Sequence, residues 1–216
     1  MRRVSSLVGV AAAVIAAPFM GLPAWGLPCV TAPVSTYTAP GFSCSVGDKT
    51  FSDIVIAPTA TGNASVTLTS INPIHFDNEF GLELNYLAIA ATMGASDVAW
   101  SYDVTSTAPM IDAFLQLTGS TTGTGQIAVT ETLSNGGVLS LTNAGTVTTT
   151  FMPTTSLHVS KDQVNFSGAN GFAEASILDN AVSQVPGPIA GAGLPGLILA
   201  CGTLLILARR RRQIAC

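Results

Sequence analysis

A long middle segment, residues 50–182, alternates short runs of β-branched and aromatic residues with clusters of Gly, Asn and Ser. Apolar and polar side chains take turns within most of these runs, as in strands that bury one face. A helix competes only at residues 86–91. Because no helical pattern separates the runs, we predict an all-β fold, an antiparallel β-sandwich. The predicted strands are residues 51–57, 64–70, 82–90, 98–106, 110–118, 126–133, 138–142, 146–151 and 172–178.

Turn residues separate these runs at positions 61–63, 122–125, 135–137 and 143–145. Asn135-Gly136 between two β-like runs is a strong hairpin signal, because both residues tolerate the positive φ of a tight turn. Residues 119–125 are also rich in glycine, but no helix follows them as it would follow a phosphate-binding loop. We therefore predict a hairpin loop at that position.

The N-terminal residues have the layout of a signal peptide. A basic start at residues 2–3 precedes an apolar run at residues 7–17, which is too short to span a bilayer. Small residues at the expected positions predict a signal peptide of residues 1–26, with cleavage after Ala24 as the alternative, and export through the Sec translocon. Prolines in this segment argue against an uncleaved anchor helix. A lipoprotein signal at Cys29 is disfavoured because proline directly precedes that cysteine.

Near the C-terminus, residues 189–208 form an uncharged stretch of about the 20 residues that cross a bilayer as a helix. The stretch ends at four adjacent arginines, Arg209, Arg210, Arg211 and Arg212. Because arginines resist translocation, we expect this end to stay in the cytoplasm and residues 27–184 to form a domain beyond the inner membrane. An ordinary single-pass membrane tail would share these features.

Val185, Pro186, Gly187 and Pro188 precede that apolar stretch. Two prolines favour an extended backbone, so the motif offers an accessible strand to a processing enzyme. Together the motif, the glycine-rich apolar stretch and the arginines resemble a PEP-CTERM sorting signal, spanning residues 185–216, with Gly187 in place of the usual Glu. This resemblance implies recognition by an exosortase, a membrane transpeptidase of Gram-negative bacteria that make extracellular polysaccharide.

Four fragments of the predicted domain, in their order along the chain, resemble landmarks of one group of PEP-CTERM ectodomains. That resemblance implies an exported architecture and carries no activity. The two lysines in these fragments, Lys49 and Lys161, are interpreted as solvated or salt-bridging residues. The fragments are residues 44–51, 101–104, 127–131 and 159–162.

The cysteines lie on different sides of the membrane in this topology. Cys201 falls in the apolar stretch and Cys216 beyond the arginines, which leaves Cys29 and Cys44 as the pair outside the membrane. An oxidising periplasm would allow these two to form a disulfide that closes a short loop and stabilises the domain by roughly 3 kcal/mol. We predict a structural role for it, since the spacing differs from that of redox motifs.

Charge and composition exclude several classes of function. The chain has a net charge of −4 and only 9% charged residues, and residues 48–179 contain two lysines against all twelve acidic residues. A segment this acidic would repel phosphate backbones, so we expect no nucleic-acid partner. The mean hydropathy of +0.50 is also unlike that of a typical cytosolic enzyme.

Known catalytic and metal-binding motifs are missing from the sequence. It has no nucleophile elbow, no zinc-protease motif and no phosphate loop with lysine. His75 and His158 lie far apart and lack ligand-spaced neighbours, and the acidic turn at residues 77–79 lacks the spacing of a calcium loop. We therefore predict no catalytic residues, no metal and no cofactor. A pair of carboxylates for glycan hydrolysis remains open, since their separation is a three-dimensional property.

We thus expect a non-enzymatic envelope or surface protein, with a structural or adhesive role in the extracellular polysaccharide layer. It would be anchored in the inner membrane before processing and would then reach the cell surface or the extracellular matrix. The alternative is a carbohydrate-binding or weakly hydrolytic module. Exposed aromatic residues on one face would favour sugar binding, and Trp100 is the tryptophan expected to remain for stacking on a sugar ring.

Overall fold

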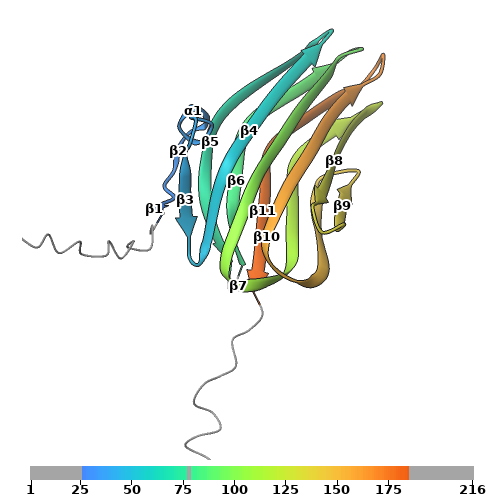
Figure 1. Ribbon diagram of the computed structural model, residues 1–216. Helices are drawn as coiled ribbons and strands as arrows, with labels where there is room; N and C mark the ends of the chain where they lie inside the picture. The colour runs from blue at the N-terminus through green and yellow to red at the C-terminus, as the bar shows by residue number, and fades with distance from the viewer. Residues whose placement is uncertain (1–25, 77–78, 185–216) are drawn as a thin grey trace, which may run out of the picture.

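In the computed structural model of this chain, residues 26–76 and 79–184 are described, and nearly all of them lie in strands (Figure 1). The predicted all-β class is confirmed, and residues 86–91 belong to a strand. The elements, in order, are β1 Leu27–Pro28, β2 Ala32–Pro33, the single-turn helix α1 Val34–Tyr37, β3 Ser43–Val46, β4 Lys49–Thr61, β5 Ala64–Phe76, β6 Glu79–Ala91, β7 Ala95–Thr122, β8 Gly125–Leu133, β9 Val138–Leu141, β10 Gly145–Ser167 and β11 Phe172–Gln184.

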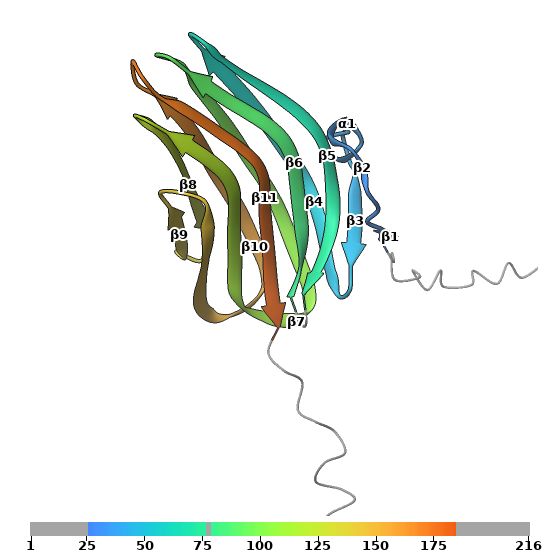
Figure 2. The same cartoon turned by 180° about the vertical axis from the view of Figure 1, so that it is seen from behind.

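The strands form one continuous sheet that curls until its two halves face each other (Figures 1 and 2). In the first half, β3, β4, β7, β10, β8 and β9 lie side by side; in the second, the order is β2, β5, β6, β11 and β7. β7 and β10 are long enough to serve both halves. The predicted sandwich therefore takes the form of a curled sheet with two facing layers.

Strand β7 carries the chain from one layer to the other. Residues 95–106 pair with β4, whereas residues 110–122 pair with β11. The sequence predicted two separate strands here, residues 98–106 and 110–118, and Pro109 lies between them. A proline within a strand is tolerated where the pairing is irregular, and the register with β10 does shift at this point.

The second half of β10 was not predicted. Residues 156–166 pair with β7 on one side, and residues 159–167 pair with β8 on the other, so this segment is central to the first layer. Its buried positions alternate along the strand, but several of them carry polar side chains. A prediction that looks for apolar residues at every second position therefore misses this strand.

The turn predictions were confirmed at one position and wrong at another. Asn135 and Gly136 connect β8 to β9, which pair as an antiparallel hairpin. Within the glycine-rich segment 119–125, Gly123 and Thr124 connect β7 to β8, but these strands do not pair with each other, because the end of β7 pairs with β11 in the second layer and β8 with β10 in the first. The predicted hairpin loop is instead a turn between the two layers, and Gly123 in it has a φ of +58°.

Apolar side chains from both layers fill the space between them. Leu82 and Leu84 of β6, Val98 of β7 and Val129 of β8 have no exposed surface. Burying such a side chain contributes about 1.5–3 kcal/mol each. The core therefore fixes which face of every strand points inward.

The predicted disulfide between Cys29 and Cys44 is confirmed, with the two Cα atoms 4.8 Å apart. It joins the segment after β1 to β3, and β1 pairs with β3 in parallel. Beyond it, Tyr37 of α1 is buried and donates a hydrogen bond to the Val30 carbonyl at 2.8 Å. These contacts fasten the start of the domain to the edge of the first layer.

Within the described ranges, no helix is long and apolar enough to cross a membrane. Apart from Gly26, the predicted signal peptide lies outside the described residues. The predicted sorting signal, with Val185, Pro186, Gly187, Pro188 and the arginines Arg209–Arg212, also lies outside them.

Candidate functional site

A row of polar side chains points into the core from β10. Lys161, Gln163, Asn165 and Ser167 occupy alternate positions of the strand and are at most 2% exposed. Burying polar groups is costly unless they are hydrogen-bonded, so each of these residues requires a partner inside the protein. The core of this domain is therefore specified by polar contacts as well as by apolar packing.

Lys161 lies in register with an acid on the neighbouring strand. Glu131 of β8 is its direct cross-strand partner, and on the other side of β10 its partner is Trp100 of β7. Because cross-strand partners share a face, the three side chains meet in the core. Lys161 Nζ lies 3.4 Å from Glu131 Oε2, and both side chains have no exposed surface.

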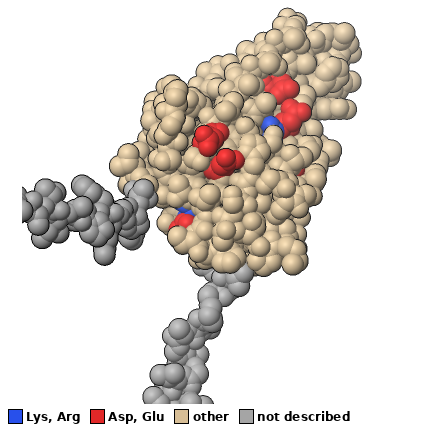
Figure 3. Space-filling view, viewed as in Figure 1, with Lys and Arg blue, Asp and Glu red and all other residues tan. Residues whose placement is uncertain are grey.

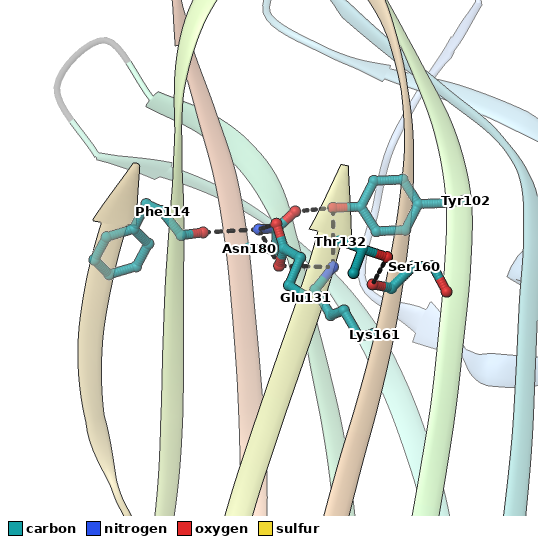
Figure 4. Close-up of polar contacts among 7 residues, drawn as sticks. All are labelled: Tyr102, Phe114, Glu131, Thr132, Ser160, Lys161 and Asn180. Carbon is teal, nitrogen blue, oxygen red and sulfur yellow. Dashed lines mark hydrogen bonds and ion pairs between the residues drawn. The ribbon is translucent and has the colours of Figure 1, made fainter. Parts of the chain in front are cut away.

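Asn180 reaches this pair from β11 in the facing layer. Its Nδ2 donates to both carboxylate oxygens of Glu131, at 2.9 Å and 2.8 Å, and to the Phe114 carbonyl at 2.8 Å. Tyr102 Oη donates to Asn180 Oδ1 and accepts a hydrogen bond from Lys161 Nζ at 3.3 Å. Figure 4 shows the four side chains converging from four strands, and we call Tyr102, Glu131, Lys161 and Asn180 the buried polar cluster.

Aromatic rings surround the amine of this cluster. Lys161 Nζ lies 4.4 Å from the centre of the Trp100 ring and 4.5 Å from that of Tyr102. Burial lowers the pKa of Lys161 to about 8, although the Glu131 charge opposes that change. Burial also raises the pKa of Glu131, against the opposing effects of Lys161 and Asn180. Both shifts favour the neutral forms of the pair.

The remaining polar residues of β10 extend the contacts away from the cluster. Gln163 Nε2 donates to Asn165 Oδ1 at 2.7 Å, and Asn165 Nδ2 donates to the Ala88 carbonyl of β6 at 2.7 Å. Because Ala88 belongs to the facing layer, Asn165 also bridges the two halves of the sheet. These amides hold β10 in register with the layer opposite.

A second group of polar residues lies on the outer face of the second layer. Asp179 of β11 and Glu83 of β6 are cross-strand partners. Asn72 and Asn85 both donate to Glu83 Oε1, at 2.5 Å and 2.6 Å. Burial, the Glu83 charge and a hydrogen bond that protonated Asp179 donates to Glu83 raise the pKa of Asp179 to about 7. Asp179 therefore keeps its proton up to about neutral pH.

This pair has the wrong spacing for glycan hydrolysis. Glycosidases hold their two carboxyl groups roughly 5–10 Å apart, so that the sugar and, in inverting enzymes, a water molecule fit between them. Glu83 and Asp179 are in direct hydrogen-bond contact. Asp97 and Asp162 of the first layer are also hydrogen-bonded, and burial and the Asp162 charge raise the pKa of Asp97. Neither pair leaves room for a scissile bond.

Lys49 and Lys161 were interpreted as solvated or salt-bridging residues; both are buried, and salt bridging is the alternative that is confirmed. Lys49 Nζ lies 2.5 Å from Asp48 Oδ1 and 5.5 Å from the centre of the Phe80 ring. Asp48 also accepts a hydrogen bond from Ser106 at 2.8 Å. Burial raises the pKa of Asp48, but the contacts with Lys49 and Ser106 outweigh it, and the net shift is downward.

The histidines have protein partners. His75 stacks on Phe80 with ring centres 4.5 Å apart, and His158 Nδ1 lies 2.6 Å from Asp103 Oδ1. Among the described residues, no group of three His, Cys, Asp or Glu is placed to hold a metal ion. The acidic turn considered for calcium includes residues 77 and 78, which lie outside the described ranges.

Trp100 was the tryptophan expected to stack on a sugar, but it is 1% exposed and faces the core. Phe76 and Phe166 are about half exposed, and they lie on different strands, β5 and β10. Figure 3 shows small separate groups of acidic residues on one face of the molecule and almost no basic surface. Both described lysines are inside.

Sequence reasoning selected three members of the buried polar cluster without placing them together. Tyr102, Glu131 and Lys161 each lie in one of the fragments that resemble PEP-CTERM ectodomains. It missed Asn180, which belongs to an ordinary Asp-Asn pair within β11. No local pattern marks that residue, because its importance comes from a partner strand far away in the sequence.

No family model matches this chain, and no curated protein matches it. Among solved structures it is similar to TmCBM61 bound to β-1,4-galactotriose, with 12% identity over 56% of this chain and 88% of that one and a TM-score of 0.30. A family 11 carbohydrate-binding module of a Clostridium thermocellum cellulase has 12% identity over 60% of this chain and 88% of that one, with a TM-score of 0.21. Carbohydrate-binding module CBM36 in complex with calcium and xylotriose has 12% identity over 57% of this chain and 98% of that one, with a TM-score of 0.24. TM-scores this low carry no argument about function.

Proposed function

We propose that this chain is an exported envelope protein with a structural or adhesive, non-enzymatic role at the cell surface. The observation that carries the proposal is the Cys29–Cys44 disulfide. Disulfides form and persist in oxidising compartments and are rare in the cytosol. The apolar stretches that flank the domain in the sequence supply the route out of the cytoplasm.

The C-terminal segment is proposed to be a sorting signal. Its order is a proline motif from Val185 to Pro188, an apolar stretch and the arginines at 209–212. The apolar stretch would hold the chain in the inner membrane and the arginines would set its orientation. An exosortase would then process the motif beyond the membrane.

Co-expression with a matching exosortase tests the sorting proposal. We expect the enzyme to lower the apparent mass of the protein and to release it from the membrane. Replacing Arg209–Arg212 with Glu should impair membrane retention, because the cytoplasmic stop is lost. A variant with both Pro186 and Pro188 changed to Ala, which leaves the membrane stretch intact, serves as the control for processing. Identical mass and membrane association with and without the enzyme would refute the proposal.

The state of the cysteines tests export separately. Alkylation of intact cells, followed by mass spectrometry under non-reducing conditions, reports whether Cys29 and Cys44 are oxidised. We expect a disulfide in cells that export the protein and two free thiols when residues 1–26 are deleted. Free thiols in the exported protein would contradict the proposal.

Glycan binding is the second candidate, and one observation favours it. Asn72, Glu83 and Asn85 lie on adjacent strands of the outer face of the second layer and are only partly buried. Carboxylates and amides of this kind hydrogen-bond to sugar hydroxyls. Calorimetric titration with polysaccharide from a producing strain tests this, with an Asn72→Ala, Glu83→Gln variant as control. Equal heats from the variant and the parent would exclude a glycan site on this face.

A further inference from the structure

We propose that the Lys161 side chain forms an amide crosslink with the side chain of Asn180, with Glu131 carrying the protons and ammonia leaving. The crosslink would join β10 of the first layer to β11 of the second. It concerns the chemistry of the core and does not depend on how the protein is sorted.

The cluster presents the Asn180 carboxamide to the amine through two short bridges. On one side, Glu131 Oε2 lies 3.4 Å from Lys161 Nζ and 2.8 Å from Asn180 Nδ2. On the other side, Tyr102 Oη lies 3.3 Å from Nζ and donates to Asn180 Oδ1. Since Oδ1 and Nδ2 are both bonded to Cγ, Glu131 and Tyr102 each link the amine to one side of the Asn180 carboxamide (Figure 4).

Glu131 and Tyr102 are placed to assist the steps of an acyl transfer, in which the amine attacks the carboxamide and ammonia leaves. An amine becomes nucleophilic when it loses its proton, and Glu131 is in contact with the amine to accept that proton. The Tyr102 hydroxyl donates to Asn180 Oδ1, where negative charge develops as the carbonyl is attacked. Glu131 also contacts Nδ2, the atom that leaves. One carboxylate therefore touches both nitrogens between which protons must move.

The reaction balances without a cofactor. Glu131 takes a proton from the Lys161 ammonium, and the neutral Nζ forms a bond to Asn180 Cγ while the carbonyl electron pair moves onto Oδ1. Glu131 passes its proton to Nδ2 and accepts the second proton from Nζ. The pair on Oδ1 then re-forms the carbonyl, the Cγ–Nδ2 bond breaks, and the nitrogen leaves as ammonia. The products are a secondary amide, ammonia and a protonated Glu131.

The buried environment favours the Lys161–Asn180 crosslink over a permanent ion pair between Lys161 and Glu131. A buried pair of charges loses its hydration, and that cost often exceeds the attraction between the charges. The crosslink removes both charges, because the amine becomes an amide and the carboxylate keeps a proton. Burial already lowers the pKa of Lys161 and raises that of Glu131, in the direction that the reaction requires. The rings of Trp100 and Tyr102 cover the amine and exclude the water that would hydrolyse the intermediate.

Mass spectrometry of the folded full-length chain tests the proposal. Loss of ammonia lowers the mass by about 17 Da, in addition to the two hydrogens lost in the disulfide. Trypsin gives a second readout, because Lys49 and Lys161 are the only lysines between the terminal arginines. A crosslinked Lys161 is an amide and resists trypsin, so in the denatured, reduced protein the chain from Thr50 through Asn180 should stay in one peptide.

Two variants serve as matched controls. Lys161→Arg keeps a cation and a trypsin site but offers no amine, and Glu131→Gln keeps the shape, the lysine and the same Lys161-Asp162 bond. We expect both variants to show the unbridged mass and cleavage after residue 161. If either variant fails to fold, the masses of the parent protein still decide the question.

Two results would overturn the proposal. If the folded parent protein has the mass of the unbridged chain and is cut after Lys161, the cluster is a buried ion pair and no more. If the Glu131→Gln protein is crosslinked as fully as the parent, Glu131 does not carry the protons. Mapping the branched peptide to Lys161 and Asn180 by fragmentation would establish the bond itself.

Discussion

Replacing both Cys29 and Cys44 with Ala should lower the free energy of unfolding by about 3 kcal/mol. The bridged residues are 15 apart in sequence, and closing a loop of that length in the unfolded chain costs about this much entropy at 25 °C. The half-cystines are 8% and 1% exposed, so alanine leaves small gaps but no unpaired polar group. The loop does not include Lys161 or Asn180, and the effect should be the same whether or not those residues are joined.

Urea unfolding followed by the fluorescence of Trp100 measures this change. Trp100 is 1% exposed, so its environment changes when the core opens. With a slope of about 2 kcal/mol per molar urea, a loss of about 3 kcal/mol moves the midpoint down by about 1.5 M. Parent protein treated with a reducing agent is the control, and it should show a similar shift.

A midpoint that moves by less than about 0.5 M, with an unchanged slope, would refute this reasoning. It would mean that the segment from β1 to α1 separates locally while the rest of the fold remains intact. Limited proteolysis distinguishes the cases, because local separation would expose residues 30–42 to cleavage well below the main transition.

Three further predictions concern the second layer. Burial and Glu83 raise the pKa of Asp179 from 3.8 to about 7, so the folded state keeps a proton that the unfolded state releases. Stability should therefore fall as pH rises from about 4 to about 7, and thermal melts of Asp179→Asn should be flatter over that range. A Cβ at Gly81 would lie 1.9 Å from the Asn180 carbonyl oxygen, so Gly81→Ala should cost about 1–3 kcal/mol in urea unfolding and reduce the fraction of crosslinked protein. Leu84 has no exposed surface, and Leu84→Ala should cost about 2–5 kcal/mol in the same measurement, with unchanged mass.

Strand positions could be predicted wherever buried positions are apolar. Leu82, Leu84 and Ala88 mark the inward face of β6, and that strand was predicted within a few residues of its bounds. β10 is the counterexample, because its inward positions include Lys161 and Asn165, which resemble loop residues in isolation. A one-dimensional pattern records polarity, whereas burial of these side chains depends on partners from other strands.

The buried polar cluster could not be predicted for the same reason: its contacts join strands that are far apart in the sequence. The sequence showed that Lys161 would be solvated or paired with an acid, but it could not identify Glu131 as that acid. The pairing follows from the register between β8 and β10, which are separated in the chain by a hairpin and half a strand. The disulfide could be predicted, since the membrane topology expected from the sequence reduced the choice to Cys29 and Cys44.

The place of β11 in the sheet determines how the domain would respond to a pull on its C-terminus. β11 ends at Gln184 and is hydrogen-bonded along its length to β6 on one side and β7 on the other. For a chain tethered beyond Gln184, tension directed along the strand would load both ladders in shear, so many hydrogen bonds would have to break together. A strand at the edge of the sheet would instead peel away one bond at a time. The domain would therefore hold under a force that unzips an edge strand.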